Sequence, residues 1–506
     1  MRELLQYEYS RTLKQVADFL EVSYASVNPN SHPNIYPNIT GLTLNSHQVT
    51  QGDLFVALQG AHTHGISFVE EAIKSGAVAI LTDHSGYEYL IKSPHKTTPC
   101  LATRDVRGAL GPLASWFFGA PSHNLRLYGI TGTNGKTTVS YLLEHIWREN
   151  RRETGLMGTV EVKVGADRYP STRTTMEAPE LQALLATYSE RHIQNVVMEV
   201  SSHSLALHRV DGSRFATVAF TNLSQDHLDF HGDMDSYFKA KKRLFTLSFA
   251  ENAIINVDTE WGLRLYQEAS IPALDLSLTN RTASWHLVEQ LPSSSHGMQF
   301  TVRGPNGVLL DVRTPLVGEY NIANAIMAIA LAVDSGIDPL AAADALSNAH
   351  GAPGRLERVE HPDGVSVLID YAHSPDAVER VISAVKPNTS GRIIGILGCG
   401  GERDSSKRPL MGKALAEGCD IAIFTSDNPR SESAAEIIEQ MQPSRFENVE
   451  VEIDRRKAIE RGLSIALKGD VLLILGKGHE SGQEIKGVVH PFNDRDIAQE
   501  LIGKNK

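Results

Sequence analysis

The chain has 506 residues, of which 41% are hydrophobic and 21% are charged, and its formal net charge at pH 7 is −12. This length predicts about three globular domains, each large enough to bury its own core. The negative charge argues against a general nucleic-acid-binding surface, but it leaves room for local basic pockets around an anionic substrate. The three cysteines are too few and too scattered for a disulfide framework or a zinc site, which suits a reducing compartment.

The N-terminal segment, to about residue 110, alternates short strands and helices. Strands are expected at 54–58 and 77–81, with a helix at 68–75 between them. The N-terminus is charged from its start, and the longest apolar run, 325–333, is too short to cross a bilayer. We therefore predict neither export nor membrane insertion. Glycines and prolines at 111–121 then interrupt the pattern, although 113–118 has helical character, and we place the first domain boundary near residue 110.

The strongest local signal in the chain is the stretch 125–150, in which strand formers precede a glycine turn and a helical apolar pattern follows it. A loop at a helix N-terminus presents free backbone N–H groups and the positive end of the helix dipole, so it favours a phosphate. Ile130 stands where ordinary phosphate loops have glycine, which argues against an ordinary NTPase. The predicted ATP-binding loop comprises Gly132, Thr133, Asn134, Gly135, Lys136, Thr137 and Thr138, with Lys136 for the outer phosphates and a threonine hydroxyl for Mg²⁺.

Further strands at 195–200, 215–220 and 253–257 predict a doubly wound sheet that carries the nucleotide at its carboxyl edge. Glu199 lies at the end of the first of these strands and His227 in the segment after the second, and both are candidates for holding a divalent cation beside the nucleotide. An arginine is the simpler alternative partner for Glu199, because a carboxylate leaving an apolar strand needs compensation for its desolvation.

A third α/β domain is expected after a hinge at 348–354. Its strands are predicted at 365–370, 392–397, 421–425 and 471–475. Each is followed by a loop rich in Gly, Asp, His or Arg, and such loops bind ligands in open α/β sheets. The predicted fold is therefore α/β with three domains, 1–110, 111–350 and 351–506.

These motifs together resemble the Mur ligases, ATP-dependent enzymes that add amino acids to a peptidoglycan precursor. The resemblance extends over nearly the whole chain and implies a central phosphate-loop domain, an N-terminal UDP-binding α/β domain and a C-terminal Rossmann-like α/β domain. Besides the phosphate loop, the matching motifs are MEVSSH at 198–203, SQDHLDFHG at 224–232, NIAN at 321–324, GRLE at 354–357 and DYAHSP at 370–375. The resemblance adds Asn321, Asn324, Arg355, Asp370 and His373 to the ATP site.

The resemblance also implies which substrates are joined, namely UDP-N-acetylmuramoyl-L-alanyl-D-glutamate and meso-2,6-diaminopimelate. Asp427, Asn428, Pro429 and Arg430 form the deciding motif. A guanidinium clamps a carboxylate bidentately, and diaminopimelate has a terminal carboxylate that lysine lacks. Lysine would leave Arg430 unpaired, at a cost of about 1–3 kcal/mol or more. Without the resemblance, the motif reads as a surface turn with a solvated arginine.

By the same resemblance, other residues contact the two substrates. The diaminopimelate pocket would be completed by Arg403, Gly476 and Glu480, the last of which suits an ammonium group. The muramoyl dipeptide and its UDP end would contact Thr174, Thr175, Ser201, Arg209 and Ser46.

Lys241 stands where this family carries a carbamylated lysine. Carbamylation turns a cationic group into an anionic one that can position Mg²⁺. It needs the free amine, and we expect Lys239, Lys242 and Arg243 to lower the pKa of Lys241. Outside the family, this basic run reads as a solvated helix face.

The chain departs from the family pattern at Asn45, His47, Leu207 and Arg173, the last replacing an asparagine before two threonines. These departures concern contacts with the donor substrate. The implied enzyme forms an acyl phosphate and then an amide, and its third domain closes on the hinge during the reaction. We expect it to be a cytoplasmic bacterial protein and a monomer. The alternatives are an L-lysine-adding ligase, a folylpolyglutamate synthetase-like ligase and a non-catalytic nucleotide-binding protein.

Overall fold

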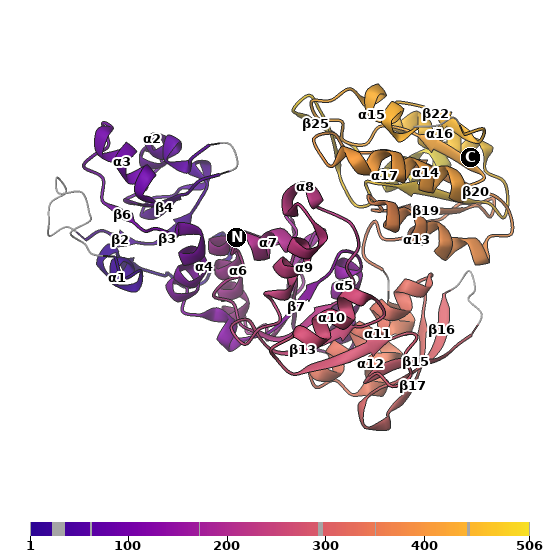
Figure 1. Ribbon diagram of the computed structural model, residues 1–506, viewed down its shortest axis with the longest axis horizontal. Coiled ribbons are helices and arrows are strands. Elements are labelled where there is room, and N and C mark those ends of the chain that lie inside the picture. The colour runs from indigo at the N-terminus through magenta and orange to yellow at the C-terminus, as the bar shows by residue number, and fades with distance from the viewer. Residues whose placement is uncertain are drawn as a thin grey trace. The chain divides into compact units, whose positions relative to one another are not determined.

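The structure is a computed structural model that describes residues 2–22, 36–60, 63–171, 173–291, 297–349, 351–442 and 446–504. Its chain forms two compact units, each assembled from separate segments. The first contains 1–129, 153–218 and 243–252, and the second contains 130–152, 219–242 and 253–506. Strands β7 (Arg126–Thr131), β12 (Phe215–Phe220) and β13 (Ala250–Asn256) contribute residues to both units. Strands β7 and β13 are labelled in Figure 1.

The first unit contains further helices and strands. Its helices are α1 (Leu13–Phe19), α2 (Val69–Lys74), α3 (His84–Lys92), α4 (Val106–Phe117), α6 (Ala178–Glu190) and α7 (Ser202–Ala206). Its strands are β1 (Arg11–Thr12), β2 (Asn38–Ile39), β3 (Gly41–Thr43), β4 (Asp53–Ala57), β5 (Ala79–Thr82), β6 (Cys100–Ala102), β8 (Thr154–Met157), β9 (Glu161–Val164), β10 (Asp167–Pro170) and β11 (Asn195–Glu199).

Two sheets organise this unit. The order β3-β4-β5-β6 is parallel throughout, which confirms the small α/β arrangement expected near the N-terminus. The order β10-β9-β8-β11-β7 leads to the strand before the phosphate loop, with β8 and β11 parallel. Every residue of β4, β5 and β11 is buried, including the polar residues at their ends, and the residues between those ends are apolar, as is typical of parallel strands covered on both faces.

Helix α4 corrects the expectation of a break at Gly111 and Pro112. The helix runs through both residues, although proline lacks the N–H that an interior position needs. Leu110, Leu113 and Phe117 are buried in an apolar cluster of the first unit. Burial of this face offsets the local cost of proline, which is about 3 kcal/mol in a helix interior.

The helices of the second unit range from 4 residues in α8 to 16 residues in α11. They are α5 (Lys136–Glu149), α8 (Leu228–His231), α9 (Met234–Lys242), α10 (Glu260–Glu268), α11 (Glu319–Asp334), α12 (Pro339–Ala345), α13 (Pro375–Val385), α14 (Arg408–Gly418), α15 (Ala434–Met441), α16 (Arg455–Ile465) and α17 (Asp494–Lys504). The strands are β14 (Ala273–Ser277), β15 (Trp285–Gln290), β16 (Met298–Arg303), β17 (Leu309–Thr314), β18 (Glu357–Val359), β19 (Ser366–Asp370), β20 (Ile393–Leu397), β21 (Ile421–Phe424), β22 (Val449–Val451), β23 (Val471–Leu475), β24 (Gly482–Ile485) and β25 (Val488–Pro491).

A six-stranded sheet of order β18-β19-β23-β20-β21-β22 forms the C-terminal part of this unit. Strand β18 is antiparallel to β19, and the other pairs are parallel. Apolar residues of α13, α14 and α15 pack on one face, and those of α16 and α17 pack on the other. The loops after β19, β23, β20 and β21 therefore leave one edge of the sheet next to one another, where open α/β folds bind ligands.

Of the hinge predicted at 348–354, residue 350 lies outside the described residues. The preceding helical turn, η7 (Leu346–Asn348), ends where the sequence pattern predicted a break. No helix in the described parts of the chain is long and apolar enough to cross a membrane.

Candidate active site

The predicted phosphate loop lies between β7 and α5, as the sequence indicated. Gly132 and Gly135 have φ angles of +146° and +89°, values that L side chains rarely adopt. A Cβ at Gly132 would collide with the Thr221 hydroxyl, and one at Gly135 would lie 2.5 Å from Asn324 Oδ1. The loop backbone is thus closely packed, and its shape requires glycine at both positions.

Lys136 begins α5 and folds back over the loop. Its Nζ donates to the carbonyl oxygens of Gly132 at 3.0 Å and Thr133 at 2.9 Å. Thr137 and Thr138, in the first turn of the helix, are buried. The ammonium group and the helix N-terminus lie together at this loop, which is the arrangement that binds phosphates.

Residues from the segment after β12 support the loop, and the sequence reasoning did not assign them this role. Asn222 Oδ1 accepts the Asn134 N–H at 3.0 Å, and the Thr221 hydroxyl donates to the Asn134 carbonyl at 2.6 Å. The Thr133 hydroxyl lies 3.1 Å from the Tyr237 hydroxyl. The position of Thr221 and Asn222 as the first two residues after a buried strand was the available signal.

Lys241 is 1% exposed, so it does not lie on the solvated face that its basic neighbours suggested. Its Nζ donates to the Gly132 carbonyl at 2.9 Å and lies 4.8 Å from the centre of the Tyr237 ring. Burial, and then the charge of Lys136, hold the pKa of Lys241 well below its ordinary value. Both effects favour the free amine of Lys241 relative to its ammonium form.

The expected origin of this pKa shift was wrong. Lys239 pairs with Asp235 at 2.6 Å, and Lys242 pairs with Glu268 at 2.7 Å, both near the surface. Arg243 forms an ion pair with Asp211 at 3.1 Å in the first unit. These sequence neighbours have acidic partners of their own, whereas Lys136, distant in sequence, acts on Lys241.

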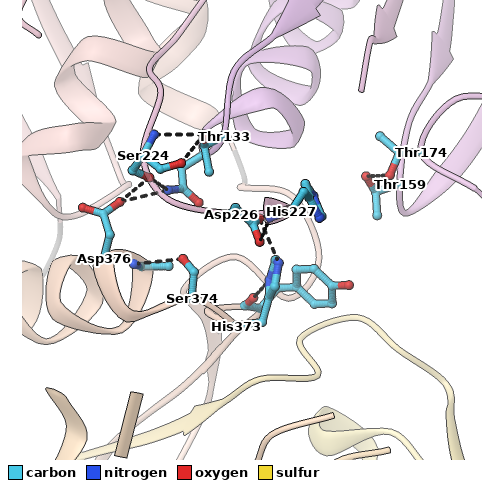
Figure 2. Close-up of polar contacts among 12 residues, drawn as sticks. Thr133, Thr159, Thr174, Ser224, Asp226, His227, His373, Ser374 and Asp376 are labelled. Atoms are coloured by element: carbon cyan, nitrogen blue, oxygen red, sulfur yellow. Dashed lines mark hydrogen bonds and ion pairs between the residues drawn. The ribbon is translucent and has the colours of Figure 1, made fainter. Parts of the chain in front are cut away.

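A carboxylate in the segment after β12 contacts two histidines. Asp226 Oδ2 lies 3.4 Å from His227 Nε2 and 3.6 Å from His373 Nε2 (Figure 2). Burial alone would raise the pKa of Asp226, but the hydrogen bond and charge of His373, with the charge of His227, hold it far below its ordinary value. His227 thus has an acidic neighbour, and its φ angle of +54° is unusual for a non-glycine residue.

Asp376, which the sequence reasoning did not single out, also contacts the phosphate loop. Its Oδ2 accepts from Asn134 Nδ2 at 3.1 Å and from the Ser224 hydroxyl at 3.0 Å (Figure 2). Ser374 caps the helix that carries Asp376, through the Ala377 N–H. The DYAHSP motif therefore contributes both its histidine and the aspartate that follows it to this region.

A cavity of about 510 Å³ lies next to the loop in the second unit. This volume is within the range of small-molecule sites. Among the residues predicted to bind ATP, those that line it are Asn134, Gly135, Thr137, Thr138, Asn321, Asn324, Arg355 and Asp370. Gly132, Thr133, Lys136 and His373 do not line it. Lining residues that the sequence reasoning missed include Asn256, Asp258, Thr259 and Arg380.

Several of these side chains are fixed by contacts with one another. Asn324 Nδ2 donates to Asn321 Oδ1 at 2.9 Å, which orients the two amides of the NIAN motif. Arg355 Nη2 donates to the Thr137 hydroxyl at 3.4 Å. Asp370 accepts the Leu356 N–H at 2.7 Å, and burial raises the pKa of its carboxyl group. The motif residues thus form a connected polar lining.

The residues predicted to hold the muramoyl dipeptide lie in the first unit. The Thr174 hydroxyl is 3.0 Å from the Thr159 hydroxyl (Figure 2). Thr175 Oγ1 accepts the Ser201 N–H at 3.1 Å and donates to the Glu199 carbonyl at 2.9 Å. Thr175 is thus joined directly to the MEVSSH motif, whereas Thr174 is joined to it through Thr159, whose hydroxyl also donates to Glu199.

Glu199 is fully buried at the end of β11. Its carboxylate accepts the backbone N–H of Thr159 at 2.8 Å and the Thr159 hydroxyl at 3.1 Å. His227 belongs to the other unit. Among the described residues, no group of three or more His, Cys, Asp or Glu side chains is placed to hold a metal ion. A shared cation site for Glu199 and His227 remains a prediction.

Arg209 and Ser46 are also in the first unit. Arg209 Nε lies 2.9 Å from Glu177 Oε1, and burial lowers the pKa of its guanidinium despite that partner. Ser46 is buried at the start of a short 3₁₀ turn, whereas His47 points outward and contacts Glu71 at 2.8 Å. The departure at His47 therefore changes a surface side chain. At the other departure, Asn45 caps the 3₁₀ turn, because Asn45 Oδ1 accepts the His47 N–H.

The Asp427–Arg430 motif follows β21 and is not the solvated turn considered above. Asp427 and Asn428 are buried, and burial raises the pKa of Asp427. Gly476 has a φ angle of +109°, and a Cβ there would lie 2.8 Å from Asp427 Oδ2. Two loops at the carboxyl edge of the sheet therefore touch at this point.

Arg430 corrects the argument for rejecting lysine. Its Nη1 donates to the Gly401 carbonyl at 2.6 Å, and its Nε lies 3.3 Å from Glu484 Oε2. The guanidinium is thus paired even in the absence of a substrate. An Arg430 left unpaired by lysine therefore cannot explain selectivity against lysine. Selectivity for diaminopimelate would require Arg430 to exchange these partners for a substrate carboxylate. Arg403, on the loop after β20, is exposed.

Glu480 already has a cationic partner, which the sequence reasoning missed. Lys477 is fully buried, and its Nζ donates to Glu480 Oε2 at 2.9 Å and to Asn428 Oδ1 at 3.2 Å. Asn428 Nδ2 donates to the same Glu480 oxygen at 2.8 Å. Lys477 therefore ties together two residues of the predicted amino-acid pocket.

Comparisons with known proteins agree with this arrangement. Three family models match the chain: Mur ligase family, catalytic domain, over 38–115; Mur ligase middle domain over 130–332; and Mur ligase, glutamate ligase domain over 354–478. A curated relative, UDP-N-acetylmuramoyl-L-alanyl-D-glutamate–2,6-diaminopimelate ligase of Streptomyces coelicolor, is 44% identical over 478 residues, which cover 92% of this chain and 93% of the relative.

Solved structures show the same fold. A structure of UDP-N-acetylmuramoyl-L-alanyl-D-glutamate–2,6-diaminopimelate ligase is 30% identical with a TM-score of 0.66 and covers 98% of this chain and 99% of that one. Folylpolyglutamate synthase of Mycobacterium tuberculosis, complexed with ADP, is 20% identical with a TM-score of 0.59 and covers 72% and 90%, which shows the fold alone. The three family models match successive segments of the chain, and together with the curated relative they show that the chain belongs to the Mur ligase family.

Proposed function

We propose that this chain joins meso-2,6-diaminopimelate to UDP-N-acetylmuramoyl-L-alanyl-D-glutamate with release of ADP and phosphate. The observation that carries the proposal is the 44% identity, over 92% of the chain, to a ligase of that name. The reaction belongs to peptidoglycan precursor synthesis. Because it consumes ATP, we place it in the bacterial cytoplasm, and we take the active chain to be a monomer.

The proposed reaction has two steps. The γ-carboxylate oxygen of the D-glutamyl residue attacks the γ-phosphorus of ATP, which forms an acyl phosphate and releases ADP. An amine of diaminopimelate then attacks the acyl carbon, loses a proton and expels phosphate. Lys136 and the loop amides would offset negative charge on the transferring group, once Lys136 exchanges the carbonyl oxygens of Gly132 and Thr133 for phosphate oxygens.

Mg²⁺ is the cation that we assign to the nucleotide. The Thr137 hydroxyl and the Glu199 carboxylate are the candidates that would supply the oxygen ligands that Mg²⁺ prefers, and His227 is the less suitable third candidate. Glu199 is buried, and its carboxylate accepts hydrogen bonds from the Thr159 N–H and hydroxyl, which fix the orientation of this candidate ligand. When bound, the ion would neutralise phosphate charge.

Lys241 is the residue to which we assign the carbamate. Its amine nitrogen would bond to the carbon of CO₂ and release a proton, so that a group beside the phosphate loop becomes anionic. Two observations support this assignment: Lys241 is buried, and burial and the charge of Lys136 lower its pKa. An unmodified ammonium at this position would repel the magnesium ion.

Recognition of the amino acid is assigned to the carboxyl edge of the C-terminal sheet. Arg430 would exchange Glu484 for the terminal carboxylate of diaminopimelate, with Arg403 on the neighbouring loop. Asn428 and Glu480, joined by Lys477, would face the ammonium group. Lysine would gain the ammonium contacts only, because it has no second carboxylate.

The domain boundaries near 110 and 350 and the hinge near residue 352 remain part of this proposal. In the proposed cycle, the third domain delivers the amine and closure excludes water from the acyl phosphate. Ser46, Thr174, Thr175, Ser201 and Arg209 would hold the UDP-linked dipeptide.

The decisive experiment measures ADP release and the mass of the product with UDP-muramoyl dipeptide and a panel of amino acids. We expect turnover with meso-diaminopimelate and little with L-lysine. Robust use of lysine and none of diaminopimelate would reassign the enzyme as a lysine-adding ligase. Turnover that requires folate and not the UDP-sugar would indicate a folylpolyglutamate synthetase-like activity.

A non-catalytic nucleotide-binding protein predicts no turnover under any of these conditions. Lys136→Ala and Lys241→Ala, made separately, test this reading. Each should abolish activity in an enzyme, whereas a binding protein has none to lose.

A further inference from the structure

Three arginines surround one glutamate beside the threonines of the proposed dipeptide site. Glu177 Oε2 lies 2.9 Å from Arg107 Nη1. Glu177 Oε1 lies 2.8 Å from Arg173 Nη1 and 2.9 Å from Arg209 Nε. All four residues belong to the first unit, so the cluster does not depend on the placement of the second. We call these residues the arginine cluster.

The charges of the arginine cluster do not balance. Three guanidiniums and one carboxylate leave a net charge of about +2, because arginine stays protonated in proteins. Arg107, Arg209 and Glu177 are mostly buried, with exposed side-chain fractions of 26%, 15% and 13%. Burial and the charges of the other two arginines lower the pKa of Arg209, whereas Glu177 opposes this effect. A second anion would relieve the repulsion among the arginines.

The backbone connects this excess charge to the proposed site for the UDP-linked dipeptide, which is the donor substrate of the reaction. Arg173 immediately precedes Thr174 and Thr175, and Glu177 follows two residues later. Arg209 Nη1 also donates to the Thr175 carbonyl at 3.4 Å. A donor substrate that contacts the two threonines would therefore have its peptide end next to the guanidiniums.

The proposed donor has two peptide carboxylates, and only one of them reacts. If three guanidiniums held the reacting carboxylate, its oxygen would lose nucleophilicity and would be kept from the γ-phosphate of ATP. The second carboxylate does not take part in bond formation, so strong binding there orients the donor without opposing the reaction. The chemistry therefore favours the non-reacting carboxylate as the missing anion.

We propose that Arg107 and Arg173 are specificity-determining residues that, with Arg209, bind the non-reacting carboxylate of the donor. In the free protein, Glu177 occupies part of this subsite. When the donor binds, Arg173, whose side chain is 51% exposed, moves from Glu177 to the incoming carboxylate. This inference rests on the proposed function for the identity of the donor, and it adds selection of an acid over the corresponding carboxamide.

Calorimetric binding tests the inference without requiring turnover. The ligands are UDP-N-acetylmuramoyl-L-alanyl-D-glutamate and its analogue with the non-reacting carboxylate converted to a carboxamide. Wild-type protein should bind the acid about tenfold to a hundredfold more tightly, as expected for charge-assisted hydrogen bonds. Arg173→Asn and Arg107→Gln should each weaken binding of the acid and leave binding of the amide nearly unchanged.

Two further variants separate recognition from folding. Arg173→Lys keeps the charge and should keep most of the preference for the acid. Arg191→Gln removes an arginine that pairs with Asp167 at 2.9 Å elsewhere in the same unit, and it should leave the preference unchanged. Thermal unfolding midpoints, measured for every variant, identify any loss caused by misfolding, because that loss would affect acid and amide equally.

The possible outcomes distinguish this inference from the proposed function. A wild-type protein that binds neither ligand contradicts the proposed function. A wild-type protein that binds both equally well, or Arg173→Asn and Arg107→Gln variants that keep the wild-type preference, overturns the specificity role. The arginine cluster would then serve only to hold α4 and α6 to the segment that carries Thr174 and Thr175.

Discussion

The two lysines at the phosphate loop give a prediction that can be measured without turnover. Lys136 Nζ and Lys241 Nζ donate to the same carbonyl oxygen of Gly132, at 3.0 and 2.9 Å. The two nitrogens therefore lie at most about 6 Å apart, and two ammonium groups at that distance repel by about 3 kcal/mol at an effective dielectric constant of about 20. This energy corresponds to about a hundredfold change in the ratio of free amine to ammonium. Replacing Lys136 by methionine removes the repulsion with little change in length.

The direction of the effect follows from the pKa of Lys241. Burial lowers that pKa, and the charge of Lys136 lowers it further, so Lys136→Met should raise it. At a fixed pH and bicarbonate concentration, less free amine is then available to combine with CO₂. Nuclear magnetic resonance of the protein in ¹³C-labelled bicarbonate measures the carbamate directly. We expect a carbamate signal in the wild type at neutral pH, and a pH midpoint for its formation that moves upward in Lys136→Met.

Control variants make the result specific. Lys242→Met removes an ammonium that pairs with Glu268 at 2.7 Å, and it should leave the pH titration unchanged. Lys241→Arg should lack the signal. Identical midpoints for the wild type and Lys136→Met would refute the role of Lys136. A signal that persists in Lys241→Arg, or no signal in the wild type at saturating bicarbonate, would refute carbamylation of Lys241.

Four other substitutions have defined expectations. Lys477→Met should raise the KM for diaminopimelate about tenfold or more in steady-state assays, because it removes a charge-assisted contact that orients the pocket; an unchanged KM would contradict that role. Arg430→Lys should raise the same KM and leave any weak use of lysine as it was, since an ammonium cannot replace a bidentate guanidinium. Gly132→Ala should weaken ATP binding, measured by calorimetry, at least tenfold, because its Cβ collides with the loop support and its φ is positive; wild-type affinity would show that the loop can adjust. Since His373 helps to hold the pKa of Asp226 below its ordinary 3.8, Asp226→Asn should be less stable than the wild type above that pH in denaturant unfolding, and the difference should shrink as the pH falls below it. A pH-independent difference would mean that Asp226 stabilises by other means.

The elements around the phosphate loop could be predicted because their signals are local. The apolar residues of β7 are buried, the apolar residues of α5 recur at helical spacing, and glycines occupy the two loop positions with positive φ. The predicted strands 215–220 and 471–475 were confirmed at both ends for the same reason. Helix α4 was only partly anticipated, because burial of its apolar face in the first unit overrides the proline within it.

The amino-acid sequence by itself determined the family, the order of its motifs and the position of the nucleotide loop, since each depends on residues close together in the chain. Only the tertiary structure decided which charges act on one another. Lys241 is affected by Lys136 and not by its basic sequence neighbours, and Glu177 collects arginines from three separate segments. Burial and ion pairing depend on which distant segments pack together, and a local residue pattern carries no information about those distances.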